Sequence, residues 1–126
     1  MTGFEAHAHA SQPDAAHYGS QAALAALREH FGYESFRPGQ AELIEAIASN
    51  RDVLGVMPTG SGKSVCYQIP ALLLHGITIV ISPLISLMRD QVDGANEIGI
   101  PAAFINTTQT MDEQEQVLDA AYAGKV

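Results

Sequence analysis

Residues 52–74 contain a short apolar segment, followed by a glycine-rich turn and then a helical pattern. This order restricts the folds that the chain can adopt. Residues 52–56 are short and β-branched, as in a buried parallel strand. Residues 63–74 predict a helix. Gly60 and Gly62 permit backbone angles that a Cβ would forbid, so successive N–H groups can turn toward one anion. The helix N-terminus adds unpaired N–H groups and partial positive charge. The pattern predicts a phosphate-binding loop in an α/β protein.

The side chains of this turn favour a nucleotide phosphate as the anion. Lys63 would reach the β- and γ-phosphates, and the Ser64 hydroxyl would complete the shell of a Mg²⁺ ion. The strict phosphate-loop pattern has glycine where this chain has Met57, and an ordinary strand-to-helix turn is the alternative. The glycine at position 60 and the preceding strand favour nucleotide binding. The predicted phosphate-binding residues are Thr59, Gly60, Ser61, Gly62, Lys63 and Ser64.

Length and charge narrow the class of protein. The chain has 126 residues, 47% of them hydrophobic, which suits one small globular domain. Its net charge of −8, from 14 acidic and 6 basic side chains, argues against a basic module that coats nucleic acid. Contact with a nucleic acid backbone through main-chain N–H groups and hydroxyls remains open. No apolar run reaches membrane-spanning length, and we expect a cytoplasmic protein with no membrane partner.

Periodicity along the chain predicts alternating strands and helices. Residues 1–20 are rich in Ala, His, Gly and Ser and predict a disordered tail. Helices are expected at 22–30, 40–49, 63–74, 84–97 and, from a capping box at Thr110 to Glu113, to about residue 123. Strands are expected at 52–56, 77–82 and 102–105. This alternation predicts an α/β fold, a parallel sheet flanked by helices with right-handed crossovers. The glycine-rich loop would then leave the ligand-binding edge of the sheet.

Three blocks of sequence, in order and sensibly spaced, carry a resemblance to a known family. They are Phe36-Arg37-Pro38-Gly39-Gln40, then Met57-Pro58-Thr59-Gly60-Ser61-Gly62-Lys63-Ser64, then Ile81-Ser82-Pro83-Leu84-Ile85-Ser86-Leu87-Met88-Arg89-Asp90-Gln91. From about residue 27 onward, the chain resembles the start of RecQ-type DNA helicases of superfamily 2. Such helicases usually carry methionine at the position of Met57. The resemblance implies a partial RecA-like P-loop NTPase domain that uses ATP and Mg²⁺.

The resemblance also implies which side chains recognise the adenine base. Gln40 has one donor and one acceptor on a planar amide, the pair that reads N6 and N7 of adenine. Tyr33 has a flat ring for stacking, and Arg37 a planar cation that could cover the base or approach a phosphate. Taken from the residues alone, Gln40 could equally be a simple helix-start residue.

A second set of residues is implied to contact DNA. Ser82 precedes Pro83 at an expected helix start, which suits both a helix N-cap and a helix N-terminus that holds a DNA phosphate. By resemblance, the DNA-contacting residues are Ser82, Ser86, Thr107 and Thr108. The implied partner is single-stranded or forked DNA.

The chain contains no Asp-Glu-x-His sequence, which this family uses to hold Mg²⁺ and position water. We therefore expect residues 21–126 to form the N-terminal part of the first RecA-like lobe, truncated before that box. The parent protein would be an ATP-dependent DNA helicase, with Lys63 catalytic, and this segment alone would be inactive. A segment of a superfamily 2 RNA helicase and a nucleotide-binding fragment without turnover are the alternatives.

Overall fold

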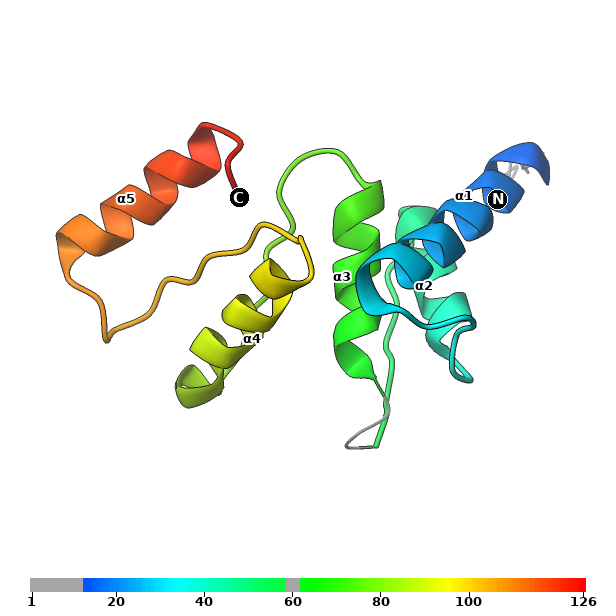
Figure 1. Ribbon diagram of the computed structural model, residues 1–126, viewed down its shortest axis with the longest axis horizontal. Helices are drawn as coiled ribbons and strands as arrows, with labels where there is room; N and C mark the ends of the chain where they lie inside the picture. Colours follow the sequence, from blue (N-terminus) through cyan, green and yellow to red (C-terminus); the bar gives the residue numbers. More distant parts are fainter. Residues whose placement is uncertain (1–12, 59–61) are drawn as a thin grey trace, which may run out of the picture.

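The computed structural model describes residues 13–58 and 62–126. Its elements are α1 (Pro13–Ala26), the π-helical turn η1 (Leu27–Phe31), α2 (Gln40–Ala48), α3 (Lys63–Leu73), α4 (Ile85–Glu97) and α5 (Met111–Tyr122) (Figure 1). The helices predicted from periodicity are therefore present, with ends shifted by a residue or two except at α1. That helix begins at Pro13, inside the expected disordered tail, because proline suits a first helical position and alanines follow it.

The core lies where α1, α2 and α3 pack on one another. Leu27 and Ile69 have no exposed surface, and Ile44 and Val65 join them in one apolar cluster. Figure 1 shows α3 beside α2, with the segment that connects the two helices running alongside. Because the apolar faces of α2 and α3 are buried against each other, the N-terminal ends of these two helices hold fixed relative positions.

The prediction of three strands is wrong for the described part of the chain, because these residues contain helices but no strand. Residues 52–56, 77–82 and 102–105 run as irregular chain, and no backbone hydrogen bond between described residues joins any two of these segments. Their apolar side chains are correspondingly exposed: Leu54 by 88%, Val56 by 90%, Ile79 by 81% and Ile81 by 93%. A strand exists only where its backbone groups pair with a neighbour, and here these segments do not pair. The predicted parallel sheet is not formed by these residues.

Polar contacts join the end of α4 to η1 and fix the segment that leads from α4 to α5. His30 Nδ1 lies 2.7 Å from the carbonyl oxygen of Ile98, which connects η1 to the end of α4. Asn96 donates to the carbonyl of Ala102 and accepts from its N–H, at 3.0 and 2.9 Å. Thr110 and Glu113 form the predicted capping box at the start of α5. These contacts set the direction of the chain between the two helices.

The helices in the described residues include none with the length and apolar composition needed to cross a membrane.

Candidate functional site

Within the predicted phosphate-binding loop, Gly62 is the N-cap residue that directly precedes α3. Gly62 has φ +77° and ψ +42°, a left-handed conformation that favours glycine. Glycine has no side chain to cap the helix, and Lys63 and Ser64 are exposed on its first turn. The first N–H groups of a helix lack intrahelical partners, so this end can receive an anion. Three predicted phosphate-binding residues, Thr59, Gly60 and Ser61, lie outside the described residues.

Gln40 connects the start of α2 to this end of the loop. Its Oε1 accepts a hydrogen bond from the Arg37 N–H at 2.8 Å, and its Nε2 donates to the Gly62 carbonyl at 3.0 Å. Only 2% of the residue is exposed. The turn at Gly39, with φ +87°, and the bond from the Gln40 N–H to the Arg37 carbonyl place the side chain. Sequence reasoning missed the contact with Gly62, because two residues far apart in the chain carry no local signal of their pairing.

Arg37 also lies beside the phosphate loop, whereas Tyr33 lies earlier in the segment that connects η1 to α2. A Cβ built on Gly62 would be 3.8 Å from a terminal guanidinium nitrogen of Arg37, so this cation sits beside the phosphate-loop end. Tyr33 is half exposed, and its ring is stacked on Phe31 with centroids 6.4 Å apart. The structure thus brings Arg37, Gln40 and Gly62 together at the start of α3.

Met57, the departure from the strict loop pattern, packs against the buried side of α3. Its Sδ lies 3.9 Å from the Cys66 thiol. Burial raises the pKa of the Cys66 thiol above its ordinary value, which favours the protonated form. Methionine therefore contributes a flexible apolar contact between the loop and its helix, which a glycine at position 57 would not make.

The four predicted DNA-contacting residues flank the start of α4 and the turn before α5. Ser82 is not the N-cap that the sequence predicted: α4 begins at Ile85, and the Ser82 hydroxyl accepts from the Leu84 N–H at 3.2 Å in the preceding turn. The reason is that Leu84, with φ −100° and ψ 77°, is not yet helical. Ser86, Thr107 and Thr108 are exposed.

Asn106 holds the Thr107–Thr108 turn in place, a role that sequence reasoning missed. Its Oδ1 accepts from the Thr108 N–H and hydroxyl at 2.9 and 2.5 Å. Its carbonyl accepts from Gln114 of α5 at 3.0 Å, and its Nδ2 lies 3.6 Å from Met88 Sδ of α4. The turn is thereby held next to the helix that carries Ser86. An Asn before two threonines, a common side-chain-to-backbone turn pattern, was the available signal.

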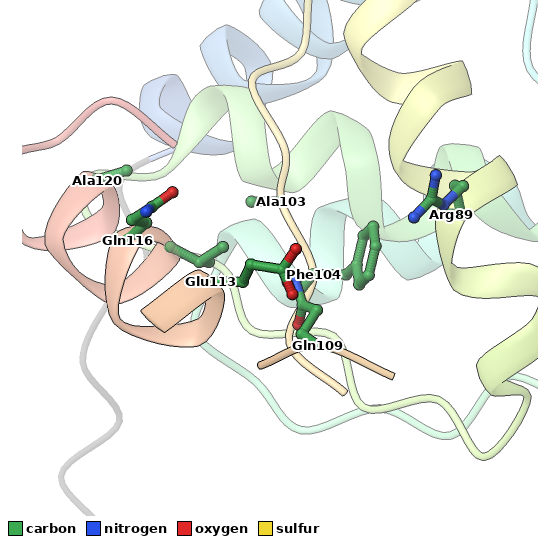
Figure 2. A pocket seen from close by; sticks show the side chains of 8 residues that line it. Arg89, Ala103, Phe104, Gln109, Glu113, Gln116 and Ala120 are labelled. Carbon is green, nitrogen blue, oxygen red and sulfur yellow. The ribbon is translucent and has the colours of Figure 1, made fainter. Parts of the chain in front are cut away.

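A cavity of about 320 Å³ lies between α4 and α5 (Figure 2). The Arg89 guanidinium lies 5.7 Å from the centre of the Phe104 ring. The Gln109 amide bonds the backbone of Asn106 and Phe104, and the Glu113 carboxylate bonds Thr110, so these polar groups serve the chain itself. The lining residues are Arg89, Ala103, Phe104, Gln109, Glu113, Gln116, Val117 and Ala120.

The described residues contain no cluster of three or more His, Cys, Asp or Glu side chains suited to a metal ion.

The chain is similar to several known DNA helicases. The chain is 54% identical over 104 residues to the ATP-dependent DNA helicase RecQ of Haemophilus influenzae, covering 82% of this chain and 17% of that protein. It is 54% identical over 99 residues to RecQ of Bacillus subtilis, covering 78% of this chain and 17% of that protein. It is 43% identical over 101 residues to the putative ATP-dependent DNA helicase Q1 of Caenorhabditis elegans, covering 80% of this chain and 16% of that protein.

The chain thus spans about a sixth of the length of these relatives, and the resemblance to RecQ-type helicases is confirmed. A family model described as DEAD/DEAH box helicase matches residues 37–124. This range includes all the residues predicted to bind nucleotide or DNA except Tyr33. This domain implies a RecA-like fold. The chain belongs to the DEAD/DEAH box helicase family.

Proposed function

We propose that residues 21–126 are the N-terminal part of the first RecA-like lobe of a RecQ-type, ATP-dependent DNA helicase. The parent enzyme couples ATP hydrolysis to strand separation, and this segment supplies its phosphate cradle, its adenine reader and a DNA-contacting edge. The names of the relatives, which are DNA helicases, support this choice over an RNA helicase. The completed parallel sheet of the lobe is part of the same proposal.

The observation that carries the proposal is the start of α3. Exposed Lys63 and Ser64 follow a left-handed Gly62 whose carbonyl is held by Gln40. The Lys63 ammonium neutralises charge on the transferred phosphoryl group, and the Ser64 hydroxyl is a ligand for Mg²⁺. A Mg²⁺ ion held there with the help of the Ser64 hydroxyl would supply further charge neutralisation. Thr59, Gly60 and Ser61 complete the cradle in this proposal.

The proposed DNA contact uses hydroxyls and main-chain N–H groups, which suits a chain with few basic side chains. Ser86 and the Thr107–Thr108 turn belong to one region, because Asn106 contacts Met88 of the same helix. Ser82 lies just ahead of that helix. We propose that these four residues hold the phosphates of a single strand or a fork.

Gln40→Ala in the whole helicase should reduce the preference for ATP over GTP. A bidentate amide–adenine pair contributes about 1–3 kcal/mol of discrimination, by analogy with Gln–adenine pairs in DNA readout. The measurement is competition between ATP and GTP for one site. The control is Ala41→Ser, a neutral change at the adjacent exposed position of α2. An unchanged preference in Gln40→Ala would show that Gln40 does not read the base.

Ser86→Glu should weaken binding of a forked DNA by about 5-fold, because a carboxylate near a phosphate costs on the order of 1 kcal/mol in a solvated setting. Fluorescence anisotropy at fixed salt measures this affinity. Gln91→Glu adds the same charge at another exposed position of α4 and should change the affinity much less. Equal losses in both variants would mean that general charge, rather than contact at Ser86, controls binding.

A further inference from the structure

We infer that Thr107 supplies the phosphate-binding donors of the turn before α5, whereas Asn106 and Thr108 are positioning residues that fix the shape of this turn. The ligand is a phosphate of a single DNA strand. This assignment rests on the proposed DNA contact and deepens it, because it gives each residue of the turn a different part.

The hydrogen of the Thr108 hydroxyl is already used within the protein. Its Oγ1 lies 2.5 Å from Asn106 Oδ1, and the Thr108 N–H donates to the same atom at 2.9 Å. Because an N–H can only donate, the Asn106 atom that receives it is the amide oxygen, which carries no hydrogen. The Thr108 hydroxyl must therefore be the donor in its own bond to Asn106.

Both hydrogens that Thr108 could offer to DNA are thus directed at Asn106. The hydroxyl keeps only lone pairs for other partners, and a phosphate oxygen in DNA is also an acceptor. Thr108 cannot donate to a phosphate without first breaking a bond to Asn106. Its part in the turn is to hold the backbone, as is common when a side-chain oxygen accepts from the backbone nearby.

The main-chain donors beside Thr107 are also occupied. The Asn106 N–H donates to Gln109 Oε1 at 3.0 Å, and the Gln109 N–H donates to the Asn106 carbonyl at 3.3 Å. Thr107 differs: it is exposed, and neither its N–H nor its hydroxyl has a hydrogen-bond partner among the described residues. This residue therefore presents two unused donors, of the two kinds that proteins use to contact the DNA backbone.

The turn is fixed against both neighbouring helices. Gln114 of α5 donates to the Asn106 carbonyl at 3.0 Å, and Asn106 Nδ2 lies 3.6 Å from Met88 Sδ of α4. A turn that is already ordered loses little conformational entropy when a ligand binds. The two donors of Thr107 are therefore held ready for a phosphate.

The test measures binding of a fluorescein-labelled oligothymidylate to the whole helicase by fluorescence anisotropy at fixed salt. Thr107→Val keeps the size of the side chain but removes its hydroxyl. It should weaken binding by about 2- to 12-fold, the range expected for loss of one hydrogen bond. Thr107→Ser keeps the hydroxyl and should restore most of the affinity.

Thr108→Val is the matched substitution at the next position. It should weaken binding by no more than about 2-fold, as is usual for a surface change, because the Thr108 N–H still bonds Asn106. The two valine variants remove the same group from adjacent exposed residues, so their difference shows which hydroxyl contacts DNA.

A double-mutant cycle tests the positioning role of Asn106. Asn106→Ala removes the acceptor that holds Thr108, which releases the turn and should weaken DNA binding. In the Thr107→Val background the same substitution should cost less, because the hydroxyl that the turn positions is already absent. Equal losses in the two backgrounds would overturn the positioning role.

The outcomes separate the inference from the proposed function. If Thr108→Val weakens binding as much as Thr107→Val, or if Thr107→Val binds like wild type, the inference is overturned. A loss in Ser86→Glu that Gln91→Glu does not share would still support the proposed DNA contact. If Ser86→Glu and both valine variants bind like wild type, the proposed DNA contact is itself wrong. Circular dichroism checks the fold, and should Asn106→Ala fail to fold, the two valine variants decide.

Discussion

Lys63→Ala in the whole helicase is expected to lower DNA-stimulated ATP turnover by about 100- to 1,000-fold, the cost typical of removing one group that stabilises transition-state charge. Lys63 is exposed at the first position of α3 and contributes nothing to the apolar cluster of Leu27, Ile44 and Ile69. The fold should therefore be unchanged while charge on the transferred phosphoryl group is no longer neutralised.

Phosphate release at saturating single-stranded DNA measures this effect, and circular dichroism checks the fold. Lys125→Ala is the matched control, because it removes another exposed lysine far along the chain from α3. Turnover within a few-fold of wild type in Lys63→Ala would remove the phosphate-loop assignment.

The sequence predicted the helices well because their signals are local. The capping box at Thr110 and Glu113 and the apolar spacing of α2 and α3 each depend on residues three or four apart. The strands at 52–56, 77–82 and 102–105 failed for the opposite reason. Alternation and β-branching show that a segment suits a sheet, but pairing needs a neighbouring backbone, which periodicity cannot specify.

The residues of the candidate site also fall into two groups, those that a local motif predicts and those that only the three-dimensional structure shows. Gly62, Lys63 and Ser64 were found from one motif, because a glycine-rich turn before a helix is a continuous pattern. The Gln40–Gly62 bond and the Asn106–Met88 contact join separate elements and were found only in three dimensions. Only the N-cap interpretation of Ser82 was wrong, because proline at position 83 suggested a helix start that Leu84 delays.

The chain of residues 1–126 by itself should neither hydrolyse ATP nor unwind DNA, and it should bind ATP weakly. Its sequence contains no Asp-Glu-x-His box to hold Mg²⁺ and the attacking water. The exposed apolar side chains of Leu54, Val56, Ile79 and Ile81 have no partner strand within the described residues. Such segments favour association with other chains.

Phosphate release in the presence of single-stranded DNA and sedimentation velocity test this expectation, with the whole helicase as the reference. We expect turnover at background and self-association that increases with concentration. Robust DNA-stimulated turnover by the isolated chain would contradict the account, because every catalytic group would then lie within these residues.

The most direct test of the central claim maps where the triphosphate binds. The whole helicase would be photolabelled with an ATP that carries an azido group on its γ-phosphate, digested, and analysed by mass spectrometry. We expect the label in the peptides that contain Lys63 and Ser64, and excess ATP should prevent the labelling. If excess ATP prevents the labelling but the label lies entirely outside the first turn of α3 and its loop, then ATP does not bind at this loop.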